Sequence, residues 1–122
     1  MERRRFIRLV QQALADLPPP YCDWLENIDV VVEPRPRARQ LREASIAPGE
    51  MLFGLYEGVP LVERTSEYGM VLPDKISIFQ EPLEQACQDE AELIEEIRLT
   101  VLHELAHHFG TSDEELAELG LD

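Results

Sequence analysis

The stretch "DEAELIEEIRLTVLHELAHHF", residues 89–109, predicts one long amphipathic helix, from which the rest of the fold can be built outward. The positions expected on its apolar face, within about 80° of Ile94 on a helical wheel, are Ala91, Ile97, Val101, Leu102, Leu105 and Phe109. His103 and His107 lie one turn apart on the opposite side of the wheel, with Glu104 at the edge of their face. We therefore expect the helix to bury its apolar face and to direct both histidines away from that contact.

Helical segments are also expected near the start of the chain. Residues 1–20, "MERRRFIRLVQQALADLPPP", have apolar side chains at helical spacing and end in three prolines, which stop a helix. Residues 21–27, "YCDWLEN", predict a short helical turn. Residues 35–50, "RPRARQLREASIAPGE", contain two prolines among many charged side chains and predict a surface loop.

Strands are expected in three places. Residues 28–34, "IDVVVEP", contain three consecutive valines and end at a proline, which favours a strand. Residues 51–63, "MLFGLYEGVPLVE", predict two short strands around a turn at Glu57 and Gly58. Residues 75–80, "KISIFQ", alternate like a half-buried strand, after a loop over residues 63–73. The chain therefore mixes strands with helices.

The size and charge of the chain limit its class. A length of 122 residues with 44% hydrophobic content suits one compact domain, expected to span residues 1–122. The net charge of −14 argues against nucleic-acid or anionic-membrane partners, which need a concentrated basic patch. No segment approaches the roughly 20 apolar residues of a membrane span, and polar residues interrupt any signal-peptide core. We therefore expect a cytoplasmic protein, with Cys22 and Cys87 as free or buried thiols.

The segment "HELAH", residues 103–107, is an HExxH motif with a chemical reason for each position. Two imidazoles at i and i+4 can bind one zinc ion and leave coordination positions open. Glu104, beside the first ligand, can take a proton from a zinc-activated water that attacks a polarised carbonyl. The pattern predicts His103 and His107 as metal ligands and Glu104 as general base.

A catalytic zinc needs a third protein ligand. We favour Asp113, because a chain reversal at Gly110 can swing it back toward the histidines. The first-turn position of Asp113 in a last helix, after a capping box of Ser112 and Glu115, is compatible with that role. His108 points toward the apolar face and is expected to be packed or hydrogen-bonded. The alternatives to Asp113 that remain open are Glu114, Glu115 and Glu118.

The chain resembles the small bacterial zincin-like metallopeptidase family, formerly a domain of unknown function. The resemblance rests on residues 100–120, "TVLHELAHHFGTSDEELAELG", on residues 52–84 and on residues 13–19, "ALADLPP". It covers nearly the whole chain, and its central motif has the form HExxHxxGxxD. The resemblance implies zinc on His103, His107 and Asp113, with Glu104 as base. It also implies a minimal zincin α+β fold: a small mixed sheet packed on the long active-site helix, with N-terminal and short C-terminal helices and an edge strand bordering the cleft.

Two hypotheses of different classes follow. The leading one is a zinc-dependent metallopeptidase that cleaves short or unfolded peptides with one catalytic zinc ion. The alternative is a non-catalytic, zinc-stabilised acidic binding or adaptor module that recruits a basic partner. Two histidines and an aspartate also suit iron or manganese. The methionine turn of the larger metzincins has no counterpart, since Met1, Met51 and Met70 all precede the motif.

Weaker candidates lie in the middle of the chain. Tyr56 and Tyr68 are possible hydrogen-bond donors to an oxyanion, or else ordinary core or loop aromatics. Residues 51–56 or 59–63 can supply an edge strand that pairs with an extended peptide, or simply form a hairpin.

Overall fold

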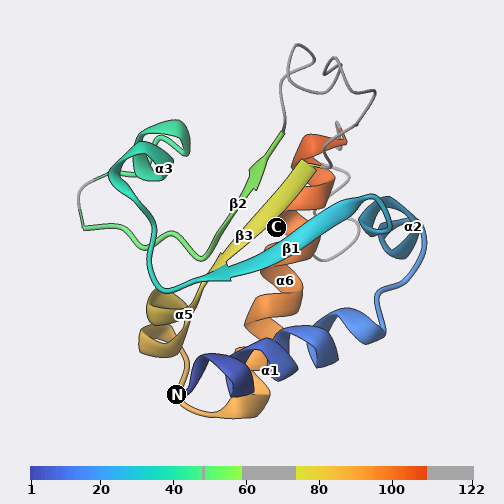
Figure 1. Cartoon of the computed structure of the whole chain (residues 1–122), viewed down its shortest axis with the longest axis horizontal. Helices are drawn as coiled ribbons and strands as arrows, with labels where there is room; N and C mark the ends of the chain where they lie inside the picture. The colour runs from blue at the N-terminus through green and yellow to red at the C-terminus, as the bar shows by residue number, and fades with distance from the viewer. Residues whose placement is uncertain (48, 59–73, 110–122) are drawn as a thin grey trace, which may run out of the picture.

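The fold is α+β, with one small sheet and several helices packed around it (Figure 1). The computed structural model describes residues 1–47, 49–58 and 74–109. The elements of this described part are α1 (Arg3–Ala15), α2 (Tyr21–Leu25), β1 (Ile28–Glu33), α3 (Ala38–Glu43), β2 (Gly54–Glu57), β3 (Asp74–Phe79), α5 (Gln80–Ala86) and α6 (Glu90–His108). None of its helices is long and apolar enough to cross a membrane.

The sheet is mixed, and β3 lies at its centre. The strand order is β1-β3-β2, with β1 parallel to β3 and β2 antiparallel to β3. The register pairs Val30 with Ile76 on one side of β3 and Tyr56 with Ile76 on the other. Among the described residues β2 is therefore an edge strand, four residues long. The strands predicted at residues 28–34 and 75–80 are confirmed, as is the first strand predicted within residues 51–63.

Helix α6 forms the other half of the core and lies behind the sheet as drawn in Figure 1, where α1 crosses its lower part. Its Ile97 and Val101 are completely buried, as are Ile76 and Ile78 of β3 and Phe6 of α1. These side chains belong to one hydrophobic cluster. The 19-residue helix begins after Asp89, whose side chain accepts a hydrogen bond from the Glu92 backbone N–H at 2.8 Å.

The predicted apolar face of α6 is correct in its middle and wrong at its ends. Ala91 is exposed, and Phe109 is 45% exposed and stacks on Trp24. Leu93 and Ala106, which lie outside the predicted face, are buried. The reason is that α6 contacts α1 and α2 as well as β2 and β3, so the buried surface is wider than one stripe.

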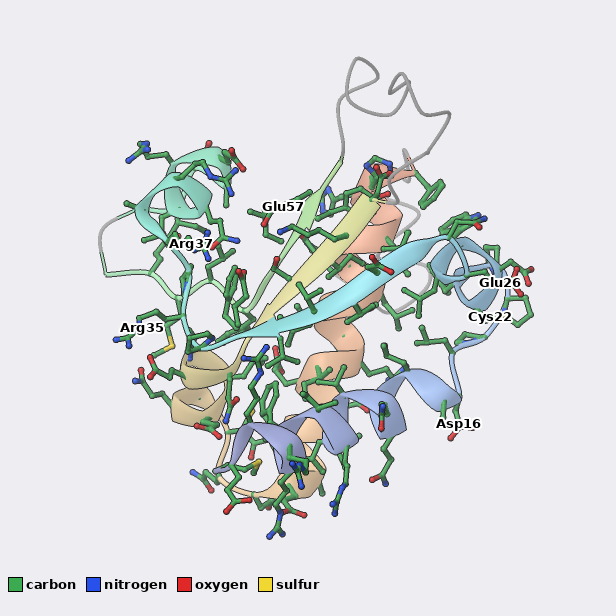
Figure 2. The ribbon with its side chains drawn as sticks, viewed as in Figure 1. Asp16, Cys22, Glu26, Arg35, Arg37 and Glu57 are labelled. Carbon is green, nitrogen blue, oxygen red and sulfur yellow. The ribbon has the colours of Figure 1, made fainter. Side chains whose placement is uncertain are left out.

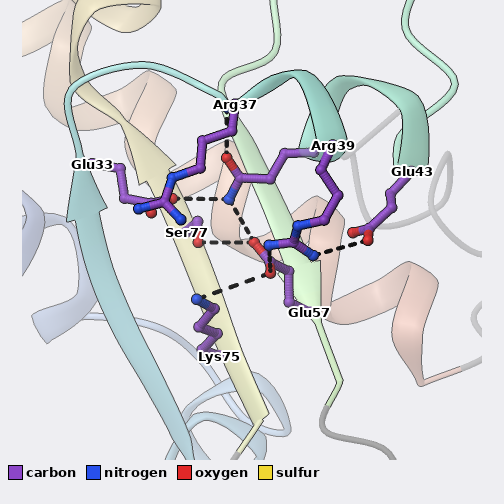
Figure 3. A network of polar contacts seen from close by, with 8 residues as sticks. Glu33, Arg37, Arg39, Glu43, Glu57, Lys75 and Ser77 are labelled. Carbon is purple, nitrogen blue, oxygen red and sulfur yellow. Dashed lines mark hydrogen bonds and ion pairs between the residues drawn. The ribbon is translucent and has the colours of Figure 1, made fainter.

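Residues 35–50 were predicted as a loop, and that prediction is wrong because they contain α3. The N-cap residue of α3 is Arg37, whose backbone N–H donates to the Gln40 side-chain oxygen at 2.8 Å. The Gln40 amide nitrogen donates to Glu33 at 2.9 Å and to Glu57 at 2.7 Å (Figure 3). These bonds satisfy Gln40, which is 1% exposed, and attach α3 to two strands.

The carboxylate of Glu57 is the centre of this polar network on the outer face of the sheet. Besides Gln40, it accepts a hydrogen bond from the Ser77 hydroxyl at 3.2 Å. Arg39 and Lys75 lie 3.6 and 3.9 Å from its second oxygen (Figure 3). The positive charges of Arg39 and Lys75 compensate the negative charge of the Glu57 carboxylate, which would be costly to bury alone. The last residue of β2 is thereby fixed to β3 and to α3.

The remaining elements agree with the sequence in part. Helix α5 follows β3 directly, in a segment whose residues suggested no element. The short helical turn at residues 21–27 is confirmed as α2, which carries Cys22 (Figure 2). The Cys22 thiol lies 3.9 Å from Asp23 Oδ1. Both cysteines are free thiols. The second strand of residues 51–63, the loop over 63–73 and the last helix lie outside the described residues.

Candidate metal centre

The HExxH motif lies in the last two turns of α6. The His103 and His107 rings are 4.4 Å apart between centroids, at an interplanar angle of 53°. His103 and Glu104 are half-buried, and His107 is exposed. The two histidines therefore border solvent, although the helix that carries them is buried in the core on its other side. Two imidazoles this close can meet at one ion after small side-chain rotations. The donor set therefore fits the first two ligands of a zinc site.

The described residues do not supply a third ligand. Within them, no group of three or more His, Cys, Asp or Glu side chains could hold a metal ion. Asp113 and its alternatives Glu114, Glu115 and Glu118 lie outside the described residues, as does Gly110. The assignment of Asp113 stays a prediction, and so do the ligand roles of the two histidines.

The carboxylate of Glu104 is held by the edge strand. Its Oε1 accepts a hydrogen bond from the Tyr56 backbone N–H at 2.9 Å, across 48 residues of sequence. Phe79 N donates to Phe53 O at 2.9 Å, and in an antiparallel pair such bonded positions alternate. The N–H of Tyr56 therefore points away from β3, toward the free edge, where Glu104 meets it. Among the hydrogen bonds between described residues, this is the one that Glu104 accepts.

His108 makes the ring contact and the near-polar contact that the sequence allowed, but its side chain is still 39% exposed, so it does not lie on the buried apolar face as predicted. Its ring stacks on the Tyr56 ring, with centroids 3.7 Å apart and an interplanar angle of 13°. Its Nε2 lies 3.9 Å from Asp74 Oδ2, and the Tyr56 hydroxyl donates to the same oxygen at 2.6 Å. The Tyr56 hydroxyl is thus bonded within the fold, and Tyr68, the other oxyanion candidate, lies outside the described residues.

Close contact between α6 and β2 depends on Gly54. A Cβ at this position would lie 2.7 Å from Thr100 Cγ2 and 3.2 Å from the Ser77 carbonyl oxygen. Only a residue without a side chain leaves room for the helix at this distance. The contact lies one turn before the motif, so it sets how near Glu104 comes to Tyr56.

Two contributors to this arrangement were not predicted from the sequence. Asp74 begins β3 and has no motif around it, so only the fold brings it to the end of α6. The backbone N–H of Tyr56 carries no side-chain signal at all. The sequence indicated these contacts only indirectly. A glycine inside a strand, here Gly54, is typical of a close approach by another element, and a polar residue, Asp74, precedes "KISIFQ".

A helix carrying HExxH, packed on a small mixed sheet with an edge strand at its glutamate, defines the zincin class of metallopeptidase architecture. Comparison with known proteins agrees: the sequence model of the family described as "Zincin-like metallopeptidase" matches residues 25–121. The chain belongs to this zincin-like metallopeptidase family.

Solved structures support the fold. The chain is similar to a conserved hypothetical protein from Thermo thermophilus, with 23% sequence identity and a TM-score of 0.56. The match covers 97% of this chain and 99% of that one. No curated protein matches the chain. The likeness therefore shows a shared fold over nearly the full length.

Proposed function

We propose that the protein is a zinc-dependent peptidase that hydrolyses peptide bonds in short or unfolded peptides. The observation that carries the proposal is the setting of Glu104. Glu104 stands between the two histidines of the motif in the sequence, and one of its carboxylate oxygens accepts a hydrogen bond from the Tyr56 N–H. Family membership supports the same reaction.

In this proposal His103, His107 and Asp113 hold the zinc ion, which when bound activates water and polarises the scissile carbonyl. Glu104 accepts the proton of the attacking water at Oε2 and returns it to the leaving amine nitrogen. The hydrogen bond from Tyr56 holds Oε1 at the strand, which leaves Oε2 as the oxygen that would take the proton. The Tyr56 N–H at the outer edge of β2 is already bonded to Glu104, so this edge is not open to backbone pairing with a peptide at that position.

The test is cleavage of a peptide library by the zinc-loaded protein and by Glu104→Gln. We expect the variant to bind zinc normally and to lose about 10²- to 10⁴-fold in kcat, the usual contribution of a general base. Glu96→Gln is the matched control, because it removes the same charge two turns earlier on the same helix. Cleavage unaffected by Glu104→Gln contradicts the proposal.

The third ligand is tested in parallel. Asp113→Ala should lower zinc affinity strongly, whereas Glu114→Ala should not. The reverse result would transfer the ligand role to Glu114. A wild-type protein that binds one zinc ion but cleaves no peptide would instead favour the adaptor function.

A further inference from the structure

One residue of β2 makes three separate contacts around the end of α6. Tyr56 donates its backbone N–H to Glu104 and its hydroxyl to Asp74, and its ring lies flat on His108. We call Tyr56, Asp74, Glu104 and His108 the Tyr56 cluster. Its members come from β2, β3 and α6, so the cluster joins three elements at the motif.

The backbone bond fixes the direction of the Glu104 carboxylate. A bond from N–H to a carboxylate is charge-assisted and about twice as strong as a neutral one. Because the Tyr56 N–H faces the free edge, no neighbouring strand of the described sheet competes for it. Glu104 is only half-buried and would otherwise sample several rotamers. The bond therefore restricts the rotamers that the Glu104 side chain can adopt.

The ring contact fixes the end of the helix. The last turn of a helix lacks the full set of backbone hydrogen bonds and frays readily. His108 is the last residue of α6, directly after His107, and its ring is nearly parallel to that of Tyr56. The 2.6 Å bond to Asp74 holds the Tyr56 ring in the orientation that the stack needs. Anchoring His108 in this way restrains the backbone that carries His107.

The strand itself is held from its other face. Side chains alternate across a strand, so Glu57 points away from α6, into the network of Gln40 and Ser77 (Figure 3). Its side chain is only 12% exposed. A short edge strand would ordinarily be loosely held, but here consecutive residues tie it to elements on opposite faces of the sheet. Tyr56 is consequently presented to α6 from a fixed position.

We infer that Tyr56 is a positioning residue of the metal centre, which orients the base Glu104 through its backbone and the ligand turn of His107 through its ring. The kinetic part of this inference rests on the proposed function. Tyr56 touches neither metal nor substrate in this role. Asp74 acts one step further out, by orienting the Tyr56 ring.

The first experiment compares Tyr56→Phe and Tyr56→Leu in the full chain. Tyr56→Leu removes the stack and the hydroxyl and should lower zinc affinity or kcat about 10- to 100-fold, as loss of outer-shell partners does. KM should change less, because the substrate is not touched. Tyr56→Phe keeps the ring and should restore most of the loss. Zinc affinity is measured by competition with a chromogenic chelator.

The matched control is Tyr21→Phe, which removes a hydroxyl from a buried tyrosine of α2 that packs on Trp24. It should leave zinc affinity and kcat unchanged. A folded Tyr56→Leu protein with zinc affinity and kcat within about twofold of wild type overturns the inference. So does a loss of thermal stability in Tyr56→Leu without any change in zinc affinity or kcat, since that pattern marks a structural role alone.

A second measurement separates this inference from the proposed function. In amide NMR spectra, Glu104→Ala should speed hydrogen exchange at the Tyr56 N–H about tenfold or more, the factor expected for a lost bond to a charged group. Tyr56→Leu should remove the ring-current shift of the His108 ring protons. A wild-type protein without zinc binding or cleavage would refute the peptidase function, whereas unchanged exchange and shifts would refute the positioning role whatever the activity.

Discussion

The substitution Gly54→Ala tests whether α6 and β2 are as close as the structure places them. The added Cβ would lie 2.7 Å from Thr100 Cγ2, whereas carbon atoms pack at about 3.5–4.0 Å. Thr100 cannot simply rotate, because its hydroxyl donates to the Glu96 carbonyl at 2.8 Å. Helix and strand must therefore separate by about 1 Å, or that hydrogen bond must break.

Two opposing effects decide whether Gly54→Ala raises or lowers the free energy of unfolding. Overpacking of a core costs about 1–3 kcal/mol, and the second contact, 3.2 Å to the Ser77 carbonyl, adds to it. Replacing glycine where its backbone angles suit alanine stabilises by only about 0.4–1 kcal/mol, through the unfolded chain. Gly54 is not among the described positive-φ glycines, so this gain applies. We expect a net loss of about 1–2 kcal/mol.

The assay is urea unfolding followed by circular dichroism, with an unchanged m-value as the sign that only stability changed. Thr100→Ser supplies the internal control, because it removes the clashing methyl and keeps the hydroxyl. Alone it should cost roughly 0.8 kcal/mol, for one buried methyl group. The double variant with Gly54→Ala has no clashing methyl. Its free energy of unfolding should therefore be about 1 kcal/mol or more higher than the sum of the two single losses predicts. Equal or higher stability of Gly54→Ala, or additivity within about 0.5 kcal/mol, would refute the close approach.

Three further predictions concern the buried amide of Gln40, the N-cap of α6 and the Cys87 thiol. Gln40→Leu should cost about 1–3 kcal/mol in the same unfolding assay, because two carboxylates lose their amide donor; an unchanged midpoint would contradict this. Asp89→Ala should cost about 0.5–2 kcal/mol by uncapping α6, whereas Asp89→Asn, which also caps, should cost little. Burial, and then the nearby carboxylates of Glu92, Glu96 and Asp89, raise the pKa of the Cys87 thiol, so in Cys22→Ser protein iodoacetamide should modify it slowly at neutral pH and faster in alkali. Rapid modification at neutral pH would contradict that environment.

Periodicity made half of the fold predictable. The apolar spacing of residues 89–109 and the valines of residues 28–34 reflect contacts within a single element, so the sequence shows them directly. The same holds for His103 and His107, whose shared face follows from a spacing of four residues. Buried polar contacts are different. The short "ARQLRE" helix looked like a loop between prolines because its anchor, Gln40, is buried by bonds to two strands elsewhere in the chain.

The support of the candidate base lies beyond local patterns for the same reason. Glu104 meets Tyr56 across 48 residues, and Tyr56 meets Asp74 across 18. Neither contact has a periodic signature, because a backbone N–H is present at every residue except proline.

Arg98 is a milder case in which a single residue departs from the helical pattern. It falls within the predicted apolar arc, yet its guanidinium reaches the surface and bonds Glu95, which lowers the pKa of that carboxyl.

The edge strand β2 is held from both of its faces, and this fixes the place where Glu104 is bonded. In β2, Tyr56 and Glu57 point to opposite faces and are each bonded by elements distant in sequence. Gln40 of α3 donates to Glu57, and the backbone N–H of the preceding residue, Tyr56, donates to Glu104. The geometry of the candidate site is accordingly a property of the whole sheet, although its motif occupies two turns of one helix.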